Sequence, residues 1–515
     1  MFRALVVFSF LLCLQPRSWA SAESASSDAL ALQEKIRLQP ELLARLSQDE
    51  QWLKILFYVQ TWFFGMRSLV DDPEFFAHPN GRADPEKELH ATLDAFLLGS
   101  DDERQRALCK YPSRRLWLEK KFAVRFADPQ PDNASEICKR NNIFRESVHA
   151  RKASLIFSSY YPGNPGSLFG HTLLKFSKIT SKGQSGSELL DYGLNHAAFP
   201  TTLNPLLYPV MGLSGFFPGY MSLMPYYVKV QEYNNAESRD LWEYELNLSE
   251  SEIQQALFSV FELSTRRVDY YYFDDNCSLL MLAVIDVARP SLRLVDKFKA
   301  WVVPSDTVRM VFNQKDLVSN IKFRPSNIRR YLELEKKLSK VERESFDSLV
   351  ELKQRNQFST SPLLTLTREQ KMNVMDTLLE FIDADEQLAG AKEPEKWKSE
   401  RPRILQMRAQ LGLASSMLEV NKPKNEAPHE AFPPTRVSLG VLTEVSPHQT
   451  PLLGTLLGWR PALHTLDNPV SGMGADLGIA FFNLEFLAHS KKVWLREFTP
   501  LSIETIPVRK PHFGA

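Results

Sequence analysis

The stretch "YYYFDDNCSLLMLAVIDVA", residues 270–288, decides how the rest of the chain is interpreted. An aromatic and acidic segment ends at Cys277, and an almost unbroken apolar run follows it. Such a run predicts a helix that is buried on nearly all sides. Asp275 or Asn276 is expected to be its N-cap. Cys277 would then lie in the first turn, where unpaired backbone N–H groups and the helix dipole favour a thiolate.

A buried structural cysteine is the simpler alternative, because free cysteines are often ordinary core residues. Asp274 and Asp275 also argue against an activated thiol, since nearby negative charge raises a thiol pKa. The motif alone therefore leaves both interpretations open.

Composition and the N-terminus indicate where the protein works. The chain has 515 residues, with 62 Lys plus Arg and 62 Asp plus Glu, so nothing global suggests a nucleic-acid partner. Residues 1–22 combine a basic start, an apolar run and the small residues "ASA", which predicts a signal peptide and a periplasmic or secreted protein. No later stretch reaches the roughly 20 apolar residues of a transmembrane helix.

Three cysteines remain after removal of the signal peptide, and an odd number leaves one thiol over in an oxidising compartment. Cys109 and Cys138 are near in sequence and lie in one helical region, so we expect a disulfide between them. Cys277 would then stay free.

A thiol nucleophile needs a base, and His171 is the best candidate. It follows the turn-like "PGSLFG" and begins the strand-like "HTLLKFSKI". "SELLDYGLN" reads as a second strand, and the loop "TSKGQSG" between them predicts a hairpin. Its register would place His171 opposite Asn195 or His196. Asn195 could then orient the imidazole, as in Cys-His-Asn hydrolases.

Two other residues stay open as the third member of the site. His196 points to the opposite face if Asn195 is in register, and Asp191 shares the face of Asn195. The chain has no H-E-x-x-H, C-x-x-C, Walker or G-x-S-x-G motif, so no metal and no cofactor are expected.

The segment 192–228 contains no Asp, Glu, Lys or Arg. A loop buried in the core is the simpler interpretation. An apolar wall or lid that receives an acyl chain beside the thiol is the alternative.

The order of patterns along the chain predicts an α+β protein. We expect a helical domain at 23–148, a thiol-enzyme domain at 149–305, a charged helical connector at 306–420 and a Pro-rich linker at 421–435. Short strand-like runs at 436–515 predict an antiparallel β region.

Several motifs in order, "SLFGHTLLKF", "DYGLNHAA", "LSGFFPGYMSLMPYYVKV" and "YYYFDDNCSLLMLAVIDVARP", resemble the Lnb N-terminal periplasmic domain family over roughly 150–300. The resemblance implies a circularly permuted papain-like core, akin to NlpC-type hydrolases and lecithin:retinol acyltransferase, in which His precedes Cys. Some members move an acyl chain to the N-terminal cysteine of a lipoprotein. By position, the resemblance makes Cys277 the nucleophile, His171 the base and Asn195 the residue that orients it.

One departure limits this transfer. Those acyltransferases usually carry polar or basic residues just after the cysteine, where this chain has Leu279 and Leu280. "CKYPSRRLWL" and "LREFTPLSIETI" resemble the flanking domains of longer relatives, and the β region implies an association with the outer membrane. The expected function is a periplasmic cysteine-dependent acyltransferase or hydrolase acting on a lipid or lipoprotein. A cell-wall amidase or peptidase and a non-catalytic envelope assembly protein are the alternatives.

Overall fold

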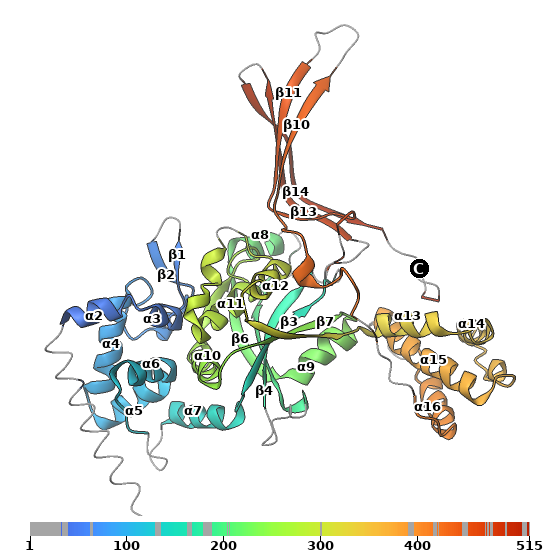
Figure 1. Ribbon diagram of the computed structural model, residues 1–515, viewed down its shortest axis with the longest axis horizontal. Coiled ribbons are helices and arrows are strands. Elements are labelled where there is room, and N and C mark those ends of the chain that lie inside the picture. Colours follow the sequence, from blue (N-terminus) through green and yellow to red (C-terminus); the bar gives the residue numbers. More distant parts are fainter. Residues whose placement is uncertain are drawn as a thin grey trace, which may run out of the picture. The chain divides into compact units, whose positions relative to one another are not determined.

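The computed structural model describes most of the chain as helices and strands that alternate along the sequence (Figure 1), which confirms the α+β class. It describes Leu32 and residues 40–61, 65–128, 135–161, 167–178, 188–202, 204, 207–298, 301–389, 396–415, 420, 422–444, 452–468, 470, 473, 477–489, 492–506 and 512–513. The predicted signal peptide, 1–22, and the loop at 180–186 lie outside these residues.

The chain divides into two compact units. The first comprises residues 1–147 and 255–266, and the second comprises 148–254 and 267–515. The division falls within the helix α10 (Glu250–Leu263). Ser249 precedes this helix and caps it, because its hydroxyl accepts a hydrogen bond from the N–H of Glu252 at 3.4 Å.

The first unit is mainly helical. Its helices are α2 (Pro40–Leu46), α3 (Glu50–Ile55), α4 (Pro85–Leu97), α5 (Asp101–Lys110), α6 (Pro112–Phe122) and α7 (Glu136–Ser147). The strands β1 (Tyr58–Thr61) and β2 (Gly65–Ser68), which the sequence did not predict, pair antiparallel. A disulfide joins Cys109 to Cys138, which confirms the expected pairing and leaves Cys277 as the free thiol of the described chain.

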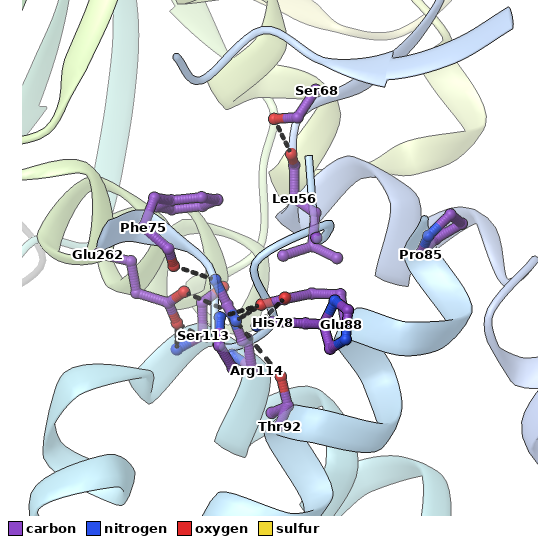
Figure 2. Close-up of polar contacts among 12 residues, drawn as sticks. Leu56, Ser68, Phe75, His78, Pro85, Glu88, Thr92, Ser113, Arg114 and Glu262 are labelled. Atoms are coloured by element: carbon purple, nitrogen blue, oxygen red, sulfur yellow. Dashed lines mark hydrogen bonds and ion pairs between the residues drawn. The ribbon is translucent and has the colours of Figure 1, made fainter. Parts of the chain in front are cut away.

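A fully buried ion-pair network lies at the centre of the first unit (Figure 2). Arg114 donates from Nη1 to Glu88 and from Nε to Glu262, the latter at 3.1 Å. Its Nη2 donates to the carbonyl of Phe75 at 2.8 Å. The two carboxylates also accept hydrogen bonds from the backbone N–H groups of Ala77, His78, Ser113 and Arg114. Loss of one partner would therefore leave a buried charge without compensation.

A seven-stranded antiparallel sheet forms the centre of the second unit. Its order is β8-β6-β5-β4-β3-β7-β9. The strands are β3 (Lys152–Ser158), β4 (His171–Ser177), β5 (Tyr192–Ala198), β6 (Phe217–Pro225), β7 (Leu241–Leu246), β8 (Arg267–Tyr270) and β9 (Val318–Arg324). Because β9 pairs with β7, the sheet extends past residue 305 into the segment that the sequence assigned to the charged connector.

The β4–β5 hairpin is present as predicted, but its register differs. Leu174 pairs with Leu194 and Phe176 with Tyr192. Continued to the start of β4, this register would place His171 opposite Ala197, so the predicted pairing with Asn195 or His196 is wrong. Since faces alternate residue by residue, His171 and Asn195 still share a face.

The uncharged segment 192–228 is neither a single loop nor a continuous wall. It contains β5, the helix α8 (Leu207–Ser214), β6 and the start of α9 (Tyr226–Val230). The strands contribute to the sheet, whereas Leu207, Val210 and Leu213 of α8 are exposed.

The charged region that follows is helical, as predicted. Its helices are α12 (Pro304–Phe312), α13 (Asn327–Lys337), α14 (Lys340–Gln354), α15 (Arg368–Ala389) and α16 (Glu400–Gln410). α13 to α16 bury one apolar face each in a common core that includes Tyr331, Phe346, Phe381 and Trp397.

The C-terminal region is a five-stranded antiparallel sheet, as predicted. Its strands are β10 (Arg436–Glu444), β11 (Leu452–Arg460), β12 (Ala462–His464), β13 (Leu477–His489) and β14 (Lys492–Thr505). One end of β13, with Ile479 and Phe481, is buried in an apolar cluster with Phe169, Phe273 and Val303 of the central domain. Of the helices that the structure describes, none combines the length and hydropathy needed to cross a membrane.

Candidate active site

Cys277 is the first residue of α11 (Cys277–Ala288), which is buried along its whole length, as the apolar run predicted. Asn276 is the N-cap: its Oδ1 accepts hydrogen bonds from the N–H groups of Ser278 at 2.9 Å and Leu279 at 3.2 Å. Its Nδ2 donates to the carbonyl of Val302 at 2.8 Å. The turn before the helix is thereby fixed, and the thiol is held at the positive end of the helix dipole.

His171 is the first residue of β4, and the glycine before it fixes where the strand starts. Gly170 has φ +84°, a conformation that residues with a Cβ rarely adopt. A Cβ at this position would lie 2.4 Å from the ring of Phe157 and 2.9 Å from the carbonyl oxygen of Ser158. Only glycine fits at this position. The backbone conformation of Gly170 therefore fixes where β4 begins and where the side chain of His171 lies.

Asn195 on β5 holds the imidazole. Its Oδ1 lies 2.6 Å from Nε2 of His171. An amide oxygen can only accept, so Nε2 carries the hydrogen and Nδ1 is left to exchange a proton with the thiol. The hydrogen bond between His171 and Cys277 completes the chain of contacts. The structure thus brings together all three residues that the sequence put forward.

The electrostatics of the site favour an ionised thiol. Burial alone would raise the pKa of Cys277, which is 2% exposed. The charge and the hydrogen bond of His171, together with Ser278 and the backbone N–H of Thr172, outweigh burial and lower this pKa from 9.0 to about 6. For His171, burial lowers the pKa, but Cys277 and Asn195 together raise it above its ordinary value. The pair is therefore suited to exist as thiolate and imidazolium at neutral pH.

Tyr270, the last residue of β8, is a fourth polar group at the sulfur. Burial raises its pKa well above 10.0, and the charge and hydrogen bond of Cys277 act in the same direction. The phenol therefore stays protonated and donates to the sulfur, while the backbone N–H of Cys277 points at its oxygen.

The other two candidates for the third member lie elsewhere. Asp191 accepts from the hydroxyl of Ser177 at 2.8 Å, at the far end of the hairpin from His171. His196 is on the opposite face of β5, stacked on Tyr270 with ring centroids 5.4 Å apart. Burial lowers the pKa of His196 to about 4, so its ring is neutral at pH 7. Its nitrogens point toward the backbone of Val268 and Asn276 without forming hydrogen bonds of good geometry.

Neither Asp274 nor Asp275 is among the groups that act most strongly on the thiol. Burial raises the pKa of Asp274 above its ordinary value. The groups that act most strongly on Cys277 are instead His171 and the donors around the sulfur.

A small pocket adjoins the sulfur, with room for about one water molecule. Apart from Cys277 and Asn276, it is lined by glycine, aliphatic and aromatic residues: Phe169, Gly170, Tyr270, Tyr272, Phe273, Val302, Val303 and Pro304. Within the described part of the chain, no group of three His, Cys, Asp or Glu side chains is arranged to hold a metal ion.

Sequence reasoning missed Tyr270 and Thr172. Tyr270 is one of three consecutive tyrosines, and no pattern distinguishes the one whose hydroxyl reaches the sulfur. Thr172 acts through its backbone N–H, which every residue but proline has, so only the register of β4 against α11 reveals it.

Two family models match the chain. The Lnb N-terminal periplasmic domain matches residues 139–314, a range that includes Cys277, His171 and Asn195. A domain of unknown function, DUF7843, matches residues 44–121 in the first unit. No curated protein and no solved structure matches the chain. The motifs and their order agree with this match, so residues 139–314 form the part of the chain that is similar to the Lnb N-terminal periplasmic domain family.

Proposed function

We propose that this protein is a periplasmic cysteine-dependent acyltransferase or hydrolase that works through an acyl-enzyme. Its core would be a circularly permuted papain-like domain, in which the strand with the base precedes the helix with the nucleophile. The observation that carries the proposal is the chain of contacts from Cys277 to His171 to Asn195, with a thiol pKa lowered to about 6. A buried structural cysteine would have its pKa raised instead.

The residues support a two-step reaction. His171 takes the proton of the Cys277 thiol, and the thiolate attacks an acyl carbonyl carbon, forming a C–S bond and an oxyanion. The oxyanion collapses, the bond to the leaving alcohol or amine breaks, and the imidazolium gives its proton to that group. An amine acceptor then takes the acyl group from the thioester in a transferase, and water takes it in a hydrolase.

Two donors favour the oxyanion. The backbone N–H of Cys277 belongs to the first helical turn and has no partner within the helix; it points at the hydroxyl oxygen of Tyr270 and would turn to the oxyanion when substrate is bound. The hydroxyl of Tyr270 lies beside it and stays protonated. Two such donors aimed at one oxygen are the usual means of stabilising a tetrahedral intermediate.

The surroundings of the sulfur favour a lipid or lipoprotein substrate. The side chains around the pocket are mostly aromatic and aliphatic. The N–H of Tyr272, in the pocket wall, donates to the carbonyl of Gly212 at 3.1 Å, which connects the wall to α8 and its exposed Leu207, Val210 and Leu213. An acyl chain is the substrate group that such walls would accommodate.

Mass spectrometry of the intact protein tests the proposal. After incubation with phospholipid vesicles or a p-nitrophenyl acyl ester, we expect one acyl group on Cys277. The adduct should be absent in Cys277→Ser and form far more slowly in His171→Gln. Equal turnover by the wild type and a folded Cys277→Ser variant would reject the mechanism.

One observation favours a non-catalytic envelope protein as the second candidate. Cys277 is 2% exposed, and its pocket holds about one water molecule, so a substrate enters only if side chains move. Alkylation of Cys277 no faster than global unfolding would support this candidate. A cell-wall amidase or peptidase would use the same residues, and release of peptide from peptidoglycan without lipid turnover would identify it.

A further inference from the structure

One face of the C-terminal sheet is apolar across four strands. The cross-strand pairs Leu439–Leu457, Leu457–Phe486 and Phe486–Leu495 run in one line from β10 through β11 and β13 to β14. Paired residues share a face, and so do their second neighbours along each strand. The same face therefore also carries Val437, Val441, Leu453, Trp459, Leu484, Val493 and Phe498.

Eight of these eleven side chains are exposed, with exposed fractions from 49% for Leu457 to 78% for Leu439, where a core residue would have almost none. The other three, Trp459, Leu484 and Phe486, are partly buried. An exposed apolar surface of this extent marks an interaction site.

The charged residues beside these apolar side chains lie on the other face. There Glu485 pairs with Arg496 at 2.6 Å. Arg460 donates to Asn483 at 2.7 Å, and Asn483 donates to Glu497 at 2.8 Å. None of the eleven residues that form the apolar face is charged, so a charged partner surface would find nothing to pair with among them.

The strand β13 connects the apolar face to the wall of the thiol pocket. Leu484 and Phe486 lie on the apolar face. Ile479 and Phe481, earlier in the same strand, are buried against Phe169, Phe273 and other members of the pocket wall. β13 therefore extends from the apolar face to the surroundings of Cys277.

We infer that this apolar face docks on a lipid surface, with the hydrocarbon of the lipid as its occupant. Between β10, β11, β13 and β14 the strands satisfy one another's backbone N–H and C=O groups, as contact with hydrocarbon requires, whereas the outer edges of β10 and β14 have no partner among the described strands. Val and Leu predominate, whereas protein interfaces are enriched in Tyr and Arg, which this face lacks. β10 and β11 have nine residues each, and at about 3.4 Å per residue the face is about 30 Å long. The inference deepens the proposed function, because it brings an acyl donor to the thiol domain.

Flotation of the full chain with phosphatidylethanolamine–phosphatidylglycerol vesicles tests the inference. We expect the wild type to float, and high salt to leave binding unchanged because the face has no charge. Leu439→Glu should weaken vesicle binding by at least about tenfold, since a buried Leu side chain is worth 1.5–3 kcal/mol. Ser438→Glu is the matched control: it places the same charge on the adjacent residue, which faces the other way.

Three outcomes would overturn the inference. The first is a wild type that does not float, and the second is an equal loss of binding in Leu439→Glu and Ser438→Glu. The third is a dimer in sedimentation without lipid that Leu439→Glu dissociates, which would make the face an interface between copies. Val441→Glu is a second variant of the same face and should lose vesicle binding as Leu439→Glu does. A native circular dichroism spectrum would show that the loss is not due to misfolding. Cys277→Ser should float like the wild type, so flotation without acylation would refute the proposed function and leave this inference standing.

Discussion

At the scale of single residues, the site depends on which group each side chain contacts. Cys277 is as buried as a core cysteine, and burial alone would keep it protonated. His171 reverses that effect, and Asn195 decides which imidazole nitrogen is available to do so. The three side chains therefore activate the thiol together. The contribution of each can be tested by measuring the reactivity of the Cys277 sulfur.

The pH dependence of alkylation is the first test at this scale. A thiol with a pKa of about 6 is roughly 90% thiolate at pH 7, whereas one at 9.0 is roughly 1%. The rate of Cys277 alkylation by iodoacetamide should therefore rise with pH around a midpoint near 6. In His171→Gln, burial is opposed only by the remaining donors such as Ser278 and the N–H of Thr172, so the midpoint should move well above 6. Identical midpoints in the two proteins would show that the imidazole does not act on the sulfur.

Tyr270→Phe isolates the role of the phenol. Removing one oxyanion donor typically costs 10²–10³-fold in kcat, so acylation of Cys277 should slow by about that factor. The pH midpoint of alkylation should rise only slightly, because His171 remains. The measurement is the rate of adduct formation with a p-nitrophenyl ester. An unchanged acylation rate would exclude the hydroxyl as a donor in the reaction.

At the scale of helices and strands, the sequence predicted the type of each element better than the register between paired strands. The apolar run after Cys277 predicted a buried helix because every face of that segment is apolar. Two strand-like patterns around a loop predicted the hairpin of β4 and β5. The predicted residue pairs were wrong, because the pattern of each strand does not determine which residue lies at the centre of the turn. Alternation alone was enough to place His171 and Asn195 on one face.

Two other features could not be predicted from the residues of their own segments. β9 lies between charged helical segments, and its inclusion in the central sheet depends on pairing with β7, which is distant in sequence. The apolar face of the C-terminal sheet emerges only from the register of four strands, since each strand alone shows no more than alternation.

Asn276→Ala tests how the helix start holds the nucleophile. The substitution removes an N-cap with two acceptor contacts and also two donors, to the carbonyls of Tyr272 and Val302. We expect a loss of about 1–3 kcal/mol in the free energy of unfolding, measured by urea titration. Asp84→Ala, at the exposed start of α4, is a matched cap with fewer contacts and should cost about 1 kcal/mol. A smaller loss for Asn276→Ala than for Asp84→Ala would contradict this account.

At the scale of the whole molecule, the chain consists of two units with separate means of stabilisation. The first has a disulfide and a buried ion-pair network, and the second has the central sheet and its buried helix α11. Unfolding need not be a single transition, since chains of several domains often depart from two-state behaviour. A perturbation in the first unit should therefore be distinguishable from one in the second.

Arg114→Met provides that perturbation. It leaves Glu88 and Glu262 buried without their cation, which typically costs 3–5 kcal/mol. Calorimetry should show a thermal transition shifted to lower temperature, with the pH midpoint of Cys277 alkylation unchanged. Arg104→Met removes an exposed pair with Asp101 in the same unit and should cost no more than about 1 kcal/mol. Equal effects of the two variants would mean that burial of the network contributes nothing.

The left-handed glycine at the entrance to β4 has a consequence for how this protein tolerates sequence change. Gly170 contributes no side chain to the chemistry, yet the ring of Phe157 and the backbone of Ser158 leave no room for even one added carbon. In a saturation library selected for acyl-enzyme formation, this position should be as intolerant as that of the nucleophile itself. Alanine, ordinarily the mildest replacement, should be rejected there, because it would displace the neighbouring imidazole.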